Sequence, residues 1–365
     1  MSHSRAYRLS SLLLLLVVGL TGFAQAASER KPPIRTGIWV MQKLPEDPSS
    51  FEEFSSHVRS NSHLSGVCLN FAWKTIEKEQ GKPDFTALDK TVDVLRKLNM
   101  KYQLCLKPGA NTPDFVYNQG AQAFPTQVTN PHRADVGQAI RIPVPWDLIY
   151  EKDFSSIIQE LGQRYASDPL CVSVVLTCAN FVSAEMHLPK TRGDISRWAA
   201  LGHYDTKLLE VYKRYTDEWA TAFPKQEVSL HLAKVLDLPI SFTEQIVDYG
   251  ASKYPDRFTI QNCQLTGRRE DIGNKTYELV LRYRDRIHHG FQSLAGLSHP
   301  NDRMGSVEMA ALNVVHAQGE YWELWHGDGM SSATSAAVAK AWDDAKQAGY
   351  EGYKQKLAAE GKYRN

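Results

Sequence analysis

Residues 64–108 read LSGVCLNFAWKTIEKEQGKPDFTALDKTVDVLRKLNMKYQLCLKP, and they contain a complete strand, helix, strand unit. Residues 66–71 and 102–106 are short apolar runs rich in strand-forming side chains. Between them, apolar side chains recur every three or four positions, as on one face of a helix: Leu88, Val92, Leu95 and Leu98. Two strands joined by such a helix lie parallel, because the crossover returns the chain to the same edge of the sheet. The stretch therefore predicts a parallel α/β fold.

The alternation of strands and helices continues along the chain. Further strands are predicted at residues 36–41, 172–177, 228–235, 258–265, 289–296 and 321–325. Further helices are predicted at residues 50–59, 153–165, 205–221, 242–249, 277–283, 306–317 and 335–347. Eight strands, each followed by a helix, predict a single-domain (β/α)8 TIM barrel. The proline-rich segment of about 40 residues after the third strand predicts a long loop that acts as a lid.

The N-terminus has the pattern of a secretory signal peptide. Arg5 and Arg8 precede a nearly continuous apolar run at residues 12–23, and Ala24-Gln25-Ala26 provides a small-x-small cleavage site. We therefore expect a signal peptide at residues 1–26, a (β/α)8 catalytic domain at residues 27–365, and a periplasmic or secreted protein. An uncleaved anchor is the alternative, but the run is shorter than the roughly 20 apolar residues that span a membrane. No later apolar segment is as long, so no membrane contact is expected after cleavage.

Composition argues against several partners and cofactors. The 42 basic and 41 acidic residues leave a net charge of +1, so nucleic acid is not expected as a partner. Because there is no glycine-rich phosphate loop, we expect no nucleotide cofactor.

The 5 cysteines fall in or at the start of apolar runs without metal-site spacing, which predicts buried free thiols and no metal. A bridge between Cys68 and Cys105, on consecutive strands, remains the alternative. The sequence leaves the oligomeric state open.

The loop that follows the strand at residues 66–71 carries a recognisable order of side chains. Trp73, Glu77 and Gly81 are followed by Asp84-Phe85 and then Leu88-Asp89. This order resembles the second βα unit of clan A glycoside hydrolases, of the kind found in families 5 and 42. The resemblance implies a (β/α)8 barrel that hydrolyses glycosidic bonds. It also implies an acid/base glutamate at the end of strand four and a glutamate nucleophile at the end of strand seven.

Two glutamates lie where a barrel enzyme builds its site, at the carboxyl ends of strands. Glu185 follows strand four and Glu323 lies within strand eight. Glycoside hydrolysis needs one protonated carboxyl group and one ionised carboxylate, so we assign Glu185 as the proton donor and Glu323 as the second carboxylate. Their separation would distinguish a retaining enzyme from an inverting one.

The family pattern is incomplete in two places. Asn180 is followed by Phe181 instead of glutamate, and strand seven carries Gln292, whose amide cannot act as a nucleophile. Three explanations stay open. The strand count is off by one, or the enzyme uses a different arrangement of residues, or the barrel is a non-catalytic relative that binds carbohydrate.

Side chains near other strand ends complete the predicted site. Trp73, Trp146 and Trp325 are expected to stack on sugar rings, and Lys107, Asn180 and Gln292 to contact sugar hydroxyls. The sequence thus predicts a secreted glycoside hydrolase that acts on a polysaccharide or oligosaccharide. The alternatives are a non-catalytic carbohydrate-binding barrel and another exported barrel hydrolase or lyase that uses histidine and lysine.

Overall fold

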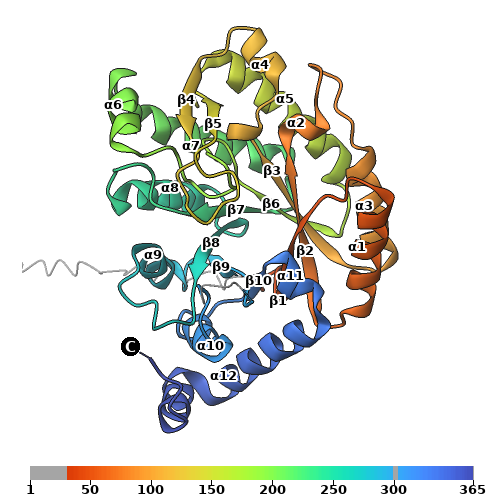
Figure 1. The fold of residues 1–365 in the computed structure, drawn as a ribbon, viewed down its shortest axis with the longest axis vertical. Coiled ribbons are helices and arrows are strands. Elements are labelled where there is room, and N and C mark those ends of the chain that lie inside the picture. The colour runs from red at the N-terminus through yellow and green to blue at the C-terminus, as the bar shows by residue number, and fades with distance from the viewer. Residues whose placement is uncertain (1–30, 299–302, 365) are drawn as a thin grey trace, which may run out of the picture. The chain divides into compact units, whose positions relative to one another are not determined.

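The computed structural model describes residues 31–298 and 303–364, so the predicted signal peptide lies outside the described residues. Eight parallel strands form the centre of the fold (Figure 1). They are β1 (Gly37–Lys43), β2 (Leu64–Ala72), β3 (Lys101–Lys107), β6 (Cys171–Val175), β7 (Glu227–Leu232), β8 (Phe258–Leu265), β9 (His288–Ser293) and β10 (Tyr321–Leu324). They close into a barrel in the order β1-β10-β9-β8-β7-β6-β3-β2. The predicted (β/α)8 barrel is confirmed.

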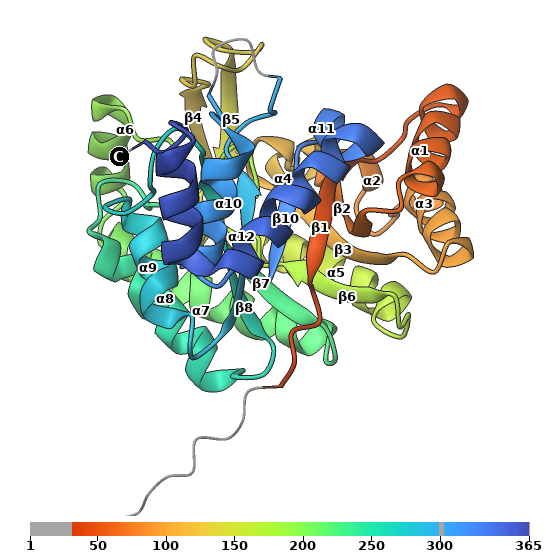
Figure 2. The same cartoon turned by 90° about the horizontal axis from the view of Figure 1, so that it is seen from below.

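Helices surround the strands, as Figures 1 and 2 show from two directions. The longer ones are α1 (Pro48–Ser60), α3 (Thr86–Lys97), α5 (Leu148–Tyr165), α6 (Arg192–Ala200), α7 (Tyr204–Ala222), α8 (Ile240–Lys253), α9 (Lys275–Tyr283), α10 (Val307–His316) and α12 (Ser332–Ala359). Short helical turns are α2 (Trp73–Ile76), η1 (Gly109–Asn111), α4 (Asp114–Asn118) and α11 (His326–Met330). The last predicted helix is longer than expected, and Gly349 breaks it at φ 68°. No helix among the described residues is long and apolar enough to span a membrane.

The strand order decides one of the open alternatives. Each predicted strand corresponds to one barrel strand, so β6 is the fourth, β9 the seventh and β10 the eighth. Gln292 therefore lies on the seventh strand and Glu323 on the eighth, and the strand count is not off by one.

The inner face of the barrel is polar, although bulky branched side chains usually fill such a core. Side chains alternate between the two faces of each strand. On the outer face, Trp322 packs against Trp342 of α12 with ring centroids 6.3 Å apart. On the inner face, the Tyr321 hydroxyl donates a hydrogen bond to Gln261 Oε1 of β8 at 2.8 Å. Buried inner-face positions include Cys68, Gln103, Cys105, Ser173, Ser229, His231, Thr259, Gln261, Cys263, Gln292, Tyr321 and Glu323.

An arginine from the segment before β1 holds the amino-terminal end of this interior together. Arg35 is buried, and its Nε donates to Glu227 Oε2 of β7 at 2.7 Å. One Nη donates to Ser229 Oγ at 2.9 Å and to Thr259 Oγ1 at 3.1 Å. The guanidinium also lies 4.0 Å from the centroid of the Tyr321 ring. This cluster links the chain before β1 to β7, β8 and β10.

The long segment after β3 contains more regular structure than the sequence predicted. Besides η1 and α4 it forms an antiparallel hairpin of β4 (Ala123–Gln127) and β5 (Ala139–Pro143). Pro125 and Pro143 lie within these strands, and proline is unfavourable in the middle of a sheet because it has no N–H to donate. In a two-stranded ribbon each strand has an open edge, and proline is tolerated where its missing N–H faces that edge. In Figure 2 the hairpin stands at the same end of the barrel as α11, which follows the carboxyl end of β10. Whether it moves as a lid stays a prediction.

All five cysteines are buried and free, as predicted. The alternative bridge between Cys68 and Cys105 is wrong, although their thiols lie side by side. Burial raises the pKa of the Cys68 thiol well above its ordinary value, so it stays protonated.

Candidate active site

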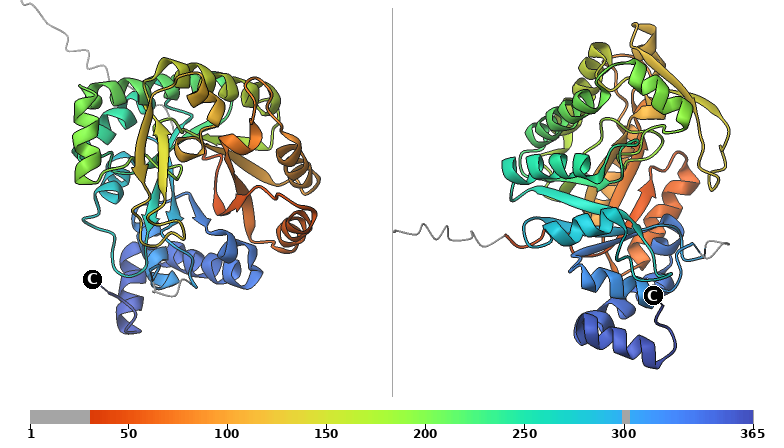
Figure 3. Two further views of the ribbon diagram at one scale, coloured as in Figure 1. Left: turned by 45° about the horizontal axis from the view of Figure 1, so that its top comes forward. Right: turned by 90° about the vertical axis from the view of Figure 1, so that its left-hand side faces the viewer.

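A cavity of about 490 Å³ opens at the carboxyl end of the barrel, within the size range of ligand sites. Its walls come from the carboxyl ends of β7, β8 and β9, from the loops after β6, β9 and β10, and from the turn of the β4–β5 hairpin, residues 128–133. Figure 3 shows this hairpin in front of the strands in its left view. The lining side chains that carry chemistry are His132, Arg133, Glu185, His187, Lys190, Cys263, Gln264, Gln292, Arg303 and Trp325. We call this the main cavity.

The loop after β6 is tied down around Asn180, which positions Glu185. The Cys178 N–H donates to Asn180 Oδ1 at 2.7 Å, and Asn180 Nδ2 donates to the carbonyls of Ala184 and Glu185, both at 2.8 Å. Gly109 has φ +67°, and a Cβ there would lie 2.2 Å from the Asn180 carbonyl oxygen. The loop can pack this closely on the end of β3 only because position 109 is glycine. Glu185 is thereby presented, partly exposed, to the main cavity.

Asn180→Ala is expected to lower both stability and kcat. The substitution leaves a buried N–H and two carbonyls without their partner, which costs about 2 to 3 kcal/mol of unfolding free energy. Glu185 then loses its fixed position, so kcat should fall while KM changes little. Thermal denaturation and steady-state kinetics check this, with Asn118→Ala at an exposed helix end as the control. A rise in KM at unchanged kcat would instead support the direct sugar contact that the sequence predicted.

Glu323 lies beside this cavity, on the inner face of β10. Its strand register pairs it with Gln292 of β9, which lines the cavity, and with Trp39 of β1. Its side chain is buried, and neither carboxylate oxygen has a hydrogen-bond partner of normal geometry among the described residues. Cys68 and Gln261 lie close by and favour the ionised form. A buried carboxyl group without full partners destabilises a fold.

The two glutamates are close enough to influence each other. Burial raises the pKa of Glu323 to about 7, Arg35 opposes this, and the charge of Glu185 adds to the rise. Cys263 also lines the cavity, and the pKa of its thiol is raised above all by burial, with smaller contributions from the charges of Glu185 and Glu323. The two carboxyl groups come from opposite sides of the barrel, because β6 and β10 are four strands apart in it, and Glu185 is partly exposed in the cavity wall whereas Glu323 is buried beside the cavity.

Three of the predicted site residues line the main cavity together: Glu185, Gln292 and Trp325. Trp325 is 41% exposed, and its Nε1 donates to the Ser293 carbonyl at 2.7 Å, so its ring is held at the cavity wall. Gln292 is nearly buried, and its Nε2 contacts Met41 Sδ at 3.5 Å.

The other predicted sugar contacts lie elsewhere. Trp73 is fully buried, and its Nε1 donates to Glu77 Oε2 at 2.7 Å, so it closes the β2–α3 loop and offers no face to a sugar. Trp146 packs on Trp198 with ring centroids 6.0 Å apart. The amide of Asn180 is used within its own loop, and Lys107 is partly buried at the end of β3 outside the cavity lining. Trp73 and Asn180 therefore serve the structure of the loops, contrary to the sequence-based assignment.

Several cavity residues were not assigned from the sequence as substrate contacts. His187 follows Glu185 by two positions, and burial lowers its pKa, so the ring is neutral at pH 7. Lys190, Arg303 and the hairpin residues His132 and Arg133 also line the cavity. The proximity of His187 to Glu185 in sequence was a usable signal, whereas the hairpin residues reach the site only through folding.

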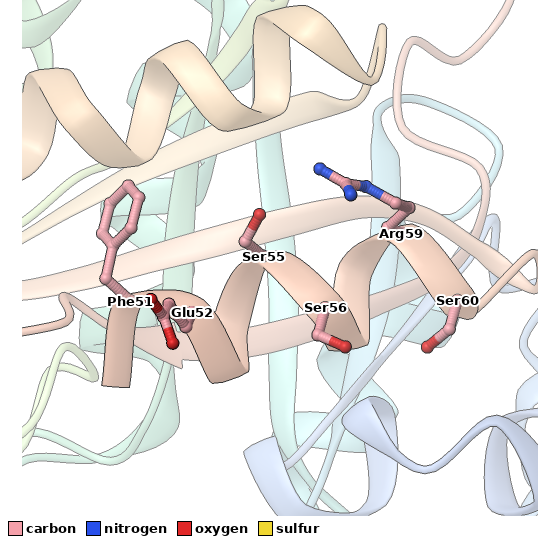
Figure 4. A pocket seen from close by; sticks show the side chains of 6 residues that line it. All are labelled: Phe51, Glu52, Ser55, Ser56, Arg59 and Ser60. Atoms are coloured by element: carbon pink, nitrogen blue, oxygen red, sulfur yellow. The ribbon is translucent and has the colours of Figure 1, made fainter. Parts of the chain in front are cut away.

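Two further features do not form a second catalytic site. Figure 4 shows a depression lined by Phe51, Glu52, Ser55, Ser56, Arg59 and Ser60, all of them from α1. A depression on one helix brings together no groups from different elements. Among residues 31–298 and 303–364, no cluster of three or more His, Cys, Asp or Glu side chains could hold a metal ion.

Comparison with known proteins supports the resemblance drawn from the sequence. The profile of glycoside hydrolase family 42, described as beta-galactosidase, matches residues 52–229. This range includes Glu185 and ends before Gln292 and Glu323. No curated protein matches the chain.

Solved structures of glycoside hydrolases share the fold. A β-galactosidase from the psychrophilic Marinomonas ef1 is 12% identical with a TM-score of 0.56, and the alignment covers 89% of this chain and 60% of that one. A β-galactosidase from Rahnella sp. R3 is 11% identical with a TM-score of 0.57, and the alignment covers 86% of this chain and 56% of that one. The catalytic domain of a β-amylase from Paenibacillus polymyxa is 10% identical with a TM-score of 0.53, and the alignment covers 84% of this chain and 98% of that one. The chain thus spans about 60% of the β-galactosidase from Marinomonas ef1. The clan A-like barrel is confirmed, and the family match supports a glycoside hydrolase.

Proposed function

We propose that this protein is an exported glycoside hydrolase that cleaves O-glycosidic bonds in a polysaccharide or oligosaccharide. The observation that carries the proposal is the pair of carboxyl groups at the main cavity: Glu185 lines it, and Glu323 is buried beside Gln292, which also lines it. The charge of Glu185 contributes to the raised pKa of Glu323, so the two groups interact.

The two glutamates take different roles. Glu185 is partly exposed and is held by the Asn180 loop, so it can reach the glycosidic oxygen and protonate the leaving group. Glu323, once ionised, stabilises positive charge on the sugar ring, as nucleophile or as base for water. Gln292, beside it in register, offers an amide to a sugar hydroxyl, and the exposed ring of Trp325 offers a stacking surface.

Glu185→Gln tests the proposal through the leaving group. A leaving group of high pKa needs a proton, so hydrolysis of a natural glycan should fall about 10²-fold or more. An aryl glycoside with an acidic phenol leaves without that help and should retain most of its rate. The rate of product release is measured for wild type and variant on both substrates, and the loss of rate on one substrate is compared with the loss on the other. Proton NMR of the product anomer that forms first shows whether the enzyme retains or inverts the configuration. Equal losses on both substrates would contradict the proton-donor role.

The second candidate is a barrel that binds carbohydrate without turnover. Gln292 on the seventh strand and the burial of Glu323 favour it, because neither offers an exposed nucleophile. A panel of glycans separates the two functions. Binding of a glycan by calorimetry, with no product after prolonged incubation, would favour this candidate.

Export rests on residues 1–26, which lie outside the described structure. The basic residues Arg5 and Arg8, the apolar run and the Ala24-Gln25-Ala26 site support it. N-terminal sequencing of protein recovered from the periplasm or the medium should begin near Ala27. Recovery of the intact N-terminus in the membrane fraction would indicate an anchor instead.

A further inference from the structure

Two smaller cavities adjoin the main cavity, and residues of the β4–β5 hairpin line both of them. A bridging cavity of about 130 Å³ shares Val128, Arg133 and Val182 with the main cavity. An outer cavity of about 410 Å³ shares Lys74, Ala110 and Ile140 with the bridging cavity. The three cavities therefore follow one another from the Glu185 loop to the start of α4, and we call this row of cavities the groove. A groove of this kind suits a chain of several sugar units.

Basic side chains outnumber acidic ones along this groove. The cationic side chains that line it are Lys74, Lys78, Arg133, Arg141, Lys190 and Arg303, and the acidic ones are Asp114, Asp135 and Glu185. The whole chain, by contrast, has a net charge of only +1. The positive excess is therefore a property of the groove.

Ion pairs within the groove account for two of the three acidic groups. Arg133 holds Asp135 with two hydrogen bonds of 2.7 and 2.8 Å, and Arg141 lies 2.7 Å from Asp114. The third acidic group is Glu185, the proposed proton donor. Lys74, Lys78 and Lys190 are exposed and have no ion-pair partner among the described residues. Their positive charges line the path that a bound chain would follow.

We propose that the substrate is an anionic polysaccharide, with carboxylate or sulfate groups on its sugar units, bound along the groove from the main cavity to Lys74 and Lys78. The inference rests on the proposed function and adds the chemical class of its substrate. Lysines at both ends of the groove attract the anionic groups, while Trp325 and Gln292 hold the sugar next to the two glutamates.

Binding to the Glu185→Gln protein tests this inference without turnover. Calorimetry compares hexasaccharides of galacturonic acid, of sulfated galactose and of neutral galactose, with a hexathymidylate as a polyanion that is not a sugar. We expect one of the two anionic sugars to bind at least tenfold more tightly than the neutral one. Because salt screens exposed charges, that affinity should fall about tenfold between 50 and 500 mM salt. The affinity for the galacturonic acid hexasaccharide compared with that for the sulfated hexasaccharide shows whether a carboxylate or a sulfate group is recognised.

Two lysines at opposite ends of the groove supply the variants. Lys78→Gln and Lys190→Gln should each weaken binding of the anionic hexasaccharide about two- to fivefold, as expected for exposed charges. Lys90→Gln, at an exposed position of α3 outside the groove, is the matched control and should have no effect. Equal affinity for the neutral sugar, no salt dependence, or equally tight binding of hexathymidylate would overturn the inference. These outcomes are distinct from failure of the proposed function, which would appear as absence of hydrolysis by the wild-type protein.

Discussion

Glu323→Gln is expected to abolish hydrolysis while making the protein more stable at pH 8. The catalytic loss should be about 10³-fold or more, because an amide can neither attack the sugar nor activate water. It should affect natural glycans and aryl glycosides with acidic phenols alike, unlike the loss in Glu185→Gln. Steady-state rates on the two substrates check this part of the prediction.

The stability gain follows from the pKa of Glu323. Burial raises this pKa from 4.5 to about 7, so between these pH values the folded protein binds a proton that the unfolded chain has released. The free energy of unfolding therefore falls as pH rises from about 4.5 through about 7, by about 3 kcal/mol in total. The glutamine has no charge to bury. Its Tm should exceed that of wild type by about 4 °C at pH 8 and match it near pH 4.5.

Thermal unfolding at both pH values measures the difference between variant and wild type. Glu227→Gln provides the contrast, because Glu227 is a buried glutamate that is paired with Arg35 and should lose stability when neutralised. The same pKa predicts that wild-type hydrolysis of the aryl glycoside, which needs no proton from Glu185, rises with pH through about 7, where Glu323 becomes ionised. Full activity of Glu323→Gln, or a rate that falls over this interval, would contradict the assignment of Glu323 as the ionised carboxylate.

Arg35→Met is expected to be the most destabilising single substitution considered for this chain. It leaves the Glu227 carboxylate buried without its cation, and removing one partner of a buried pair costs about 3 to 5 kcal/mol. The hydrogen bonds to Ser229 and Thr259 are lost as well. Denaturant unfolding should show a lower midpoint with an unchanged slope.

Two comparisons make this prediction specific. The double variant Arg35→Met/Glu227→Met replaces the pair with apolar side chains and should recover most of the lost stability. Lys31→Met breaks an exposed pair with Asp256 of similar length, 2.6 Å, and should change stability by less than about 1 kcal/mol. If the single Arg35 variant were as stable as wild type, the cluster before β1 would have no role in closing the barrel.

The barrel was predictable because its signals are local. Each strand is a short apolar run and each major helix has a periodic apolar face, and both patterns lie within 20 consecutive residues. The alternation of the two then permits few topologies, because crossovers between parallel strands share one handedness. The β4–β5 hairpin was missed because its proline-containing strands carry little local signal, and only its position over the barrel end stabilises it.

The site was predictable only in part. The rule that barrel sites form at the carboxyl ends of strands selected Glu185, Gln292, Glu323 and Trp325, and the structure places all four at or beside one cavity. Trp73 and Asn180 satisfied the same rule, yet their polar atoms are used within their own loops. A residue type near a strand end does not reveal where its side chain points.

Local patterns and the order of the strands were enough to predict the (β/α)8 architecture, to reveal the resemblance to clan A glycoside hydrolases and to select the two glutamates as candidates. Tertiary structure alone decided that Glu323 is buried without full partners, with a pKa near 7, and that a hairpin about 50 residues before Glu185 completes the cavity. Burial and electrostatic coupling depend on distances between residues far apart in the chain. Those distances exist only after the barrel has closed.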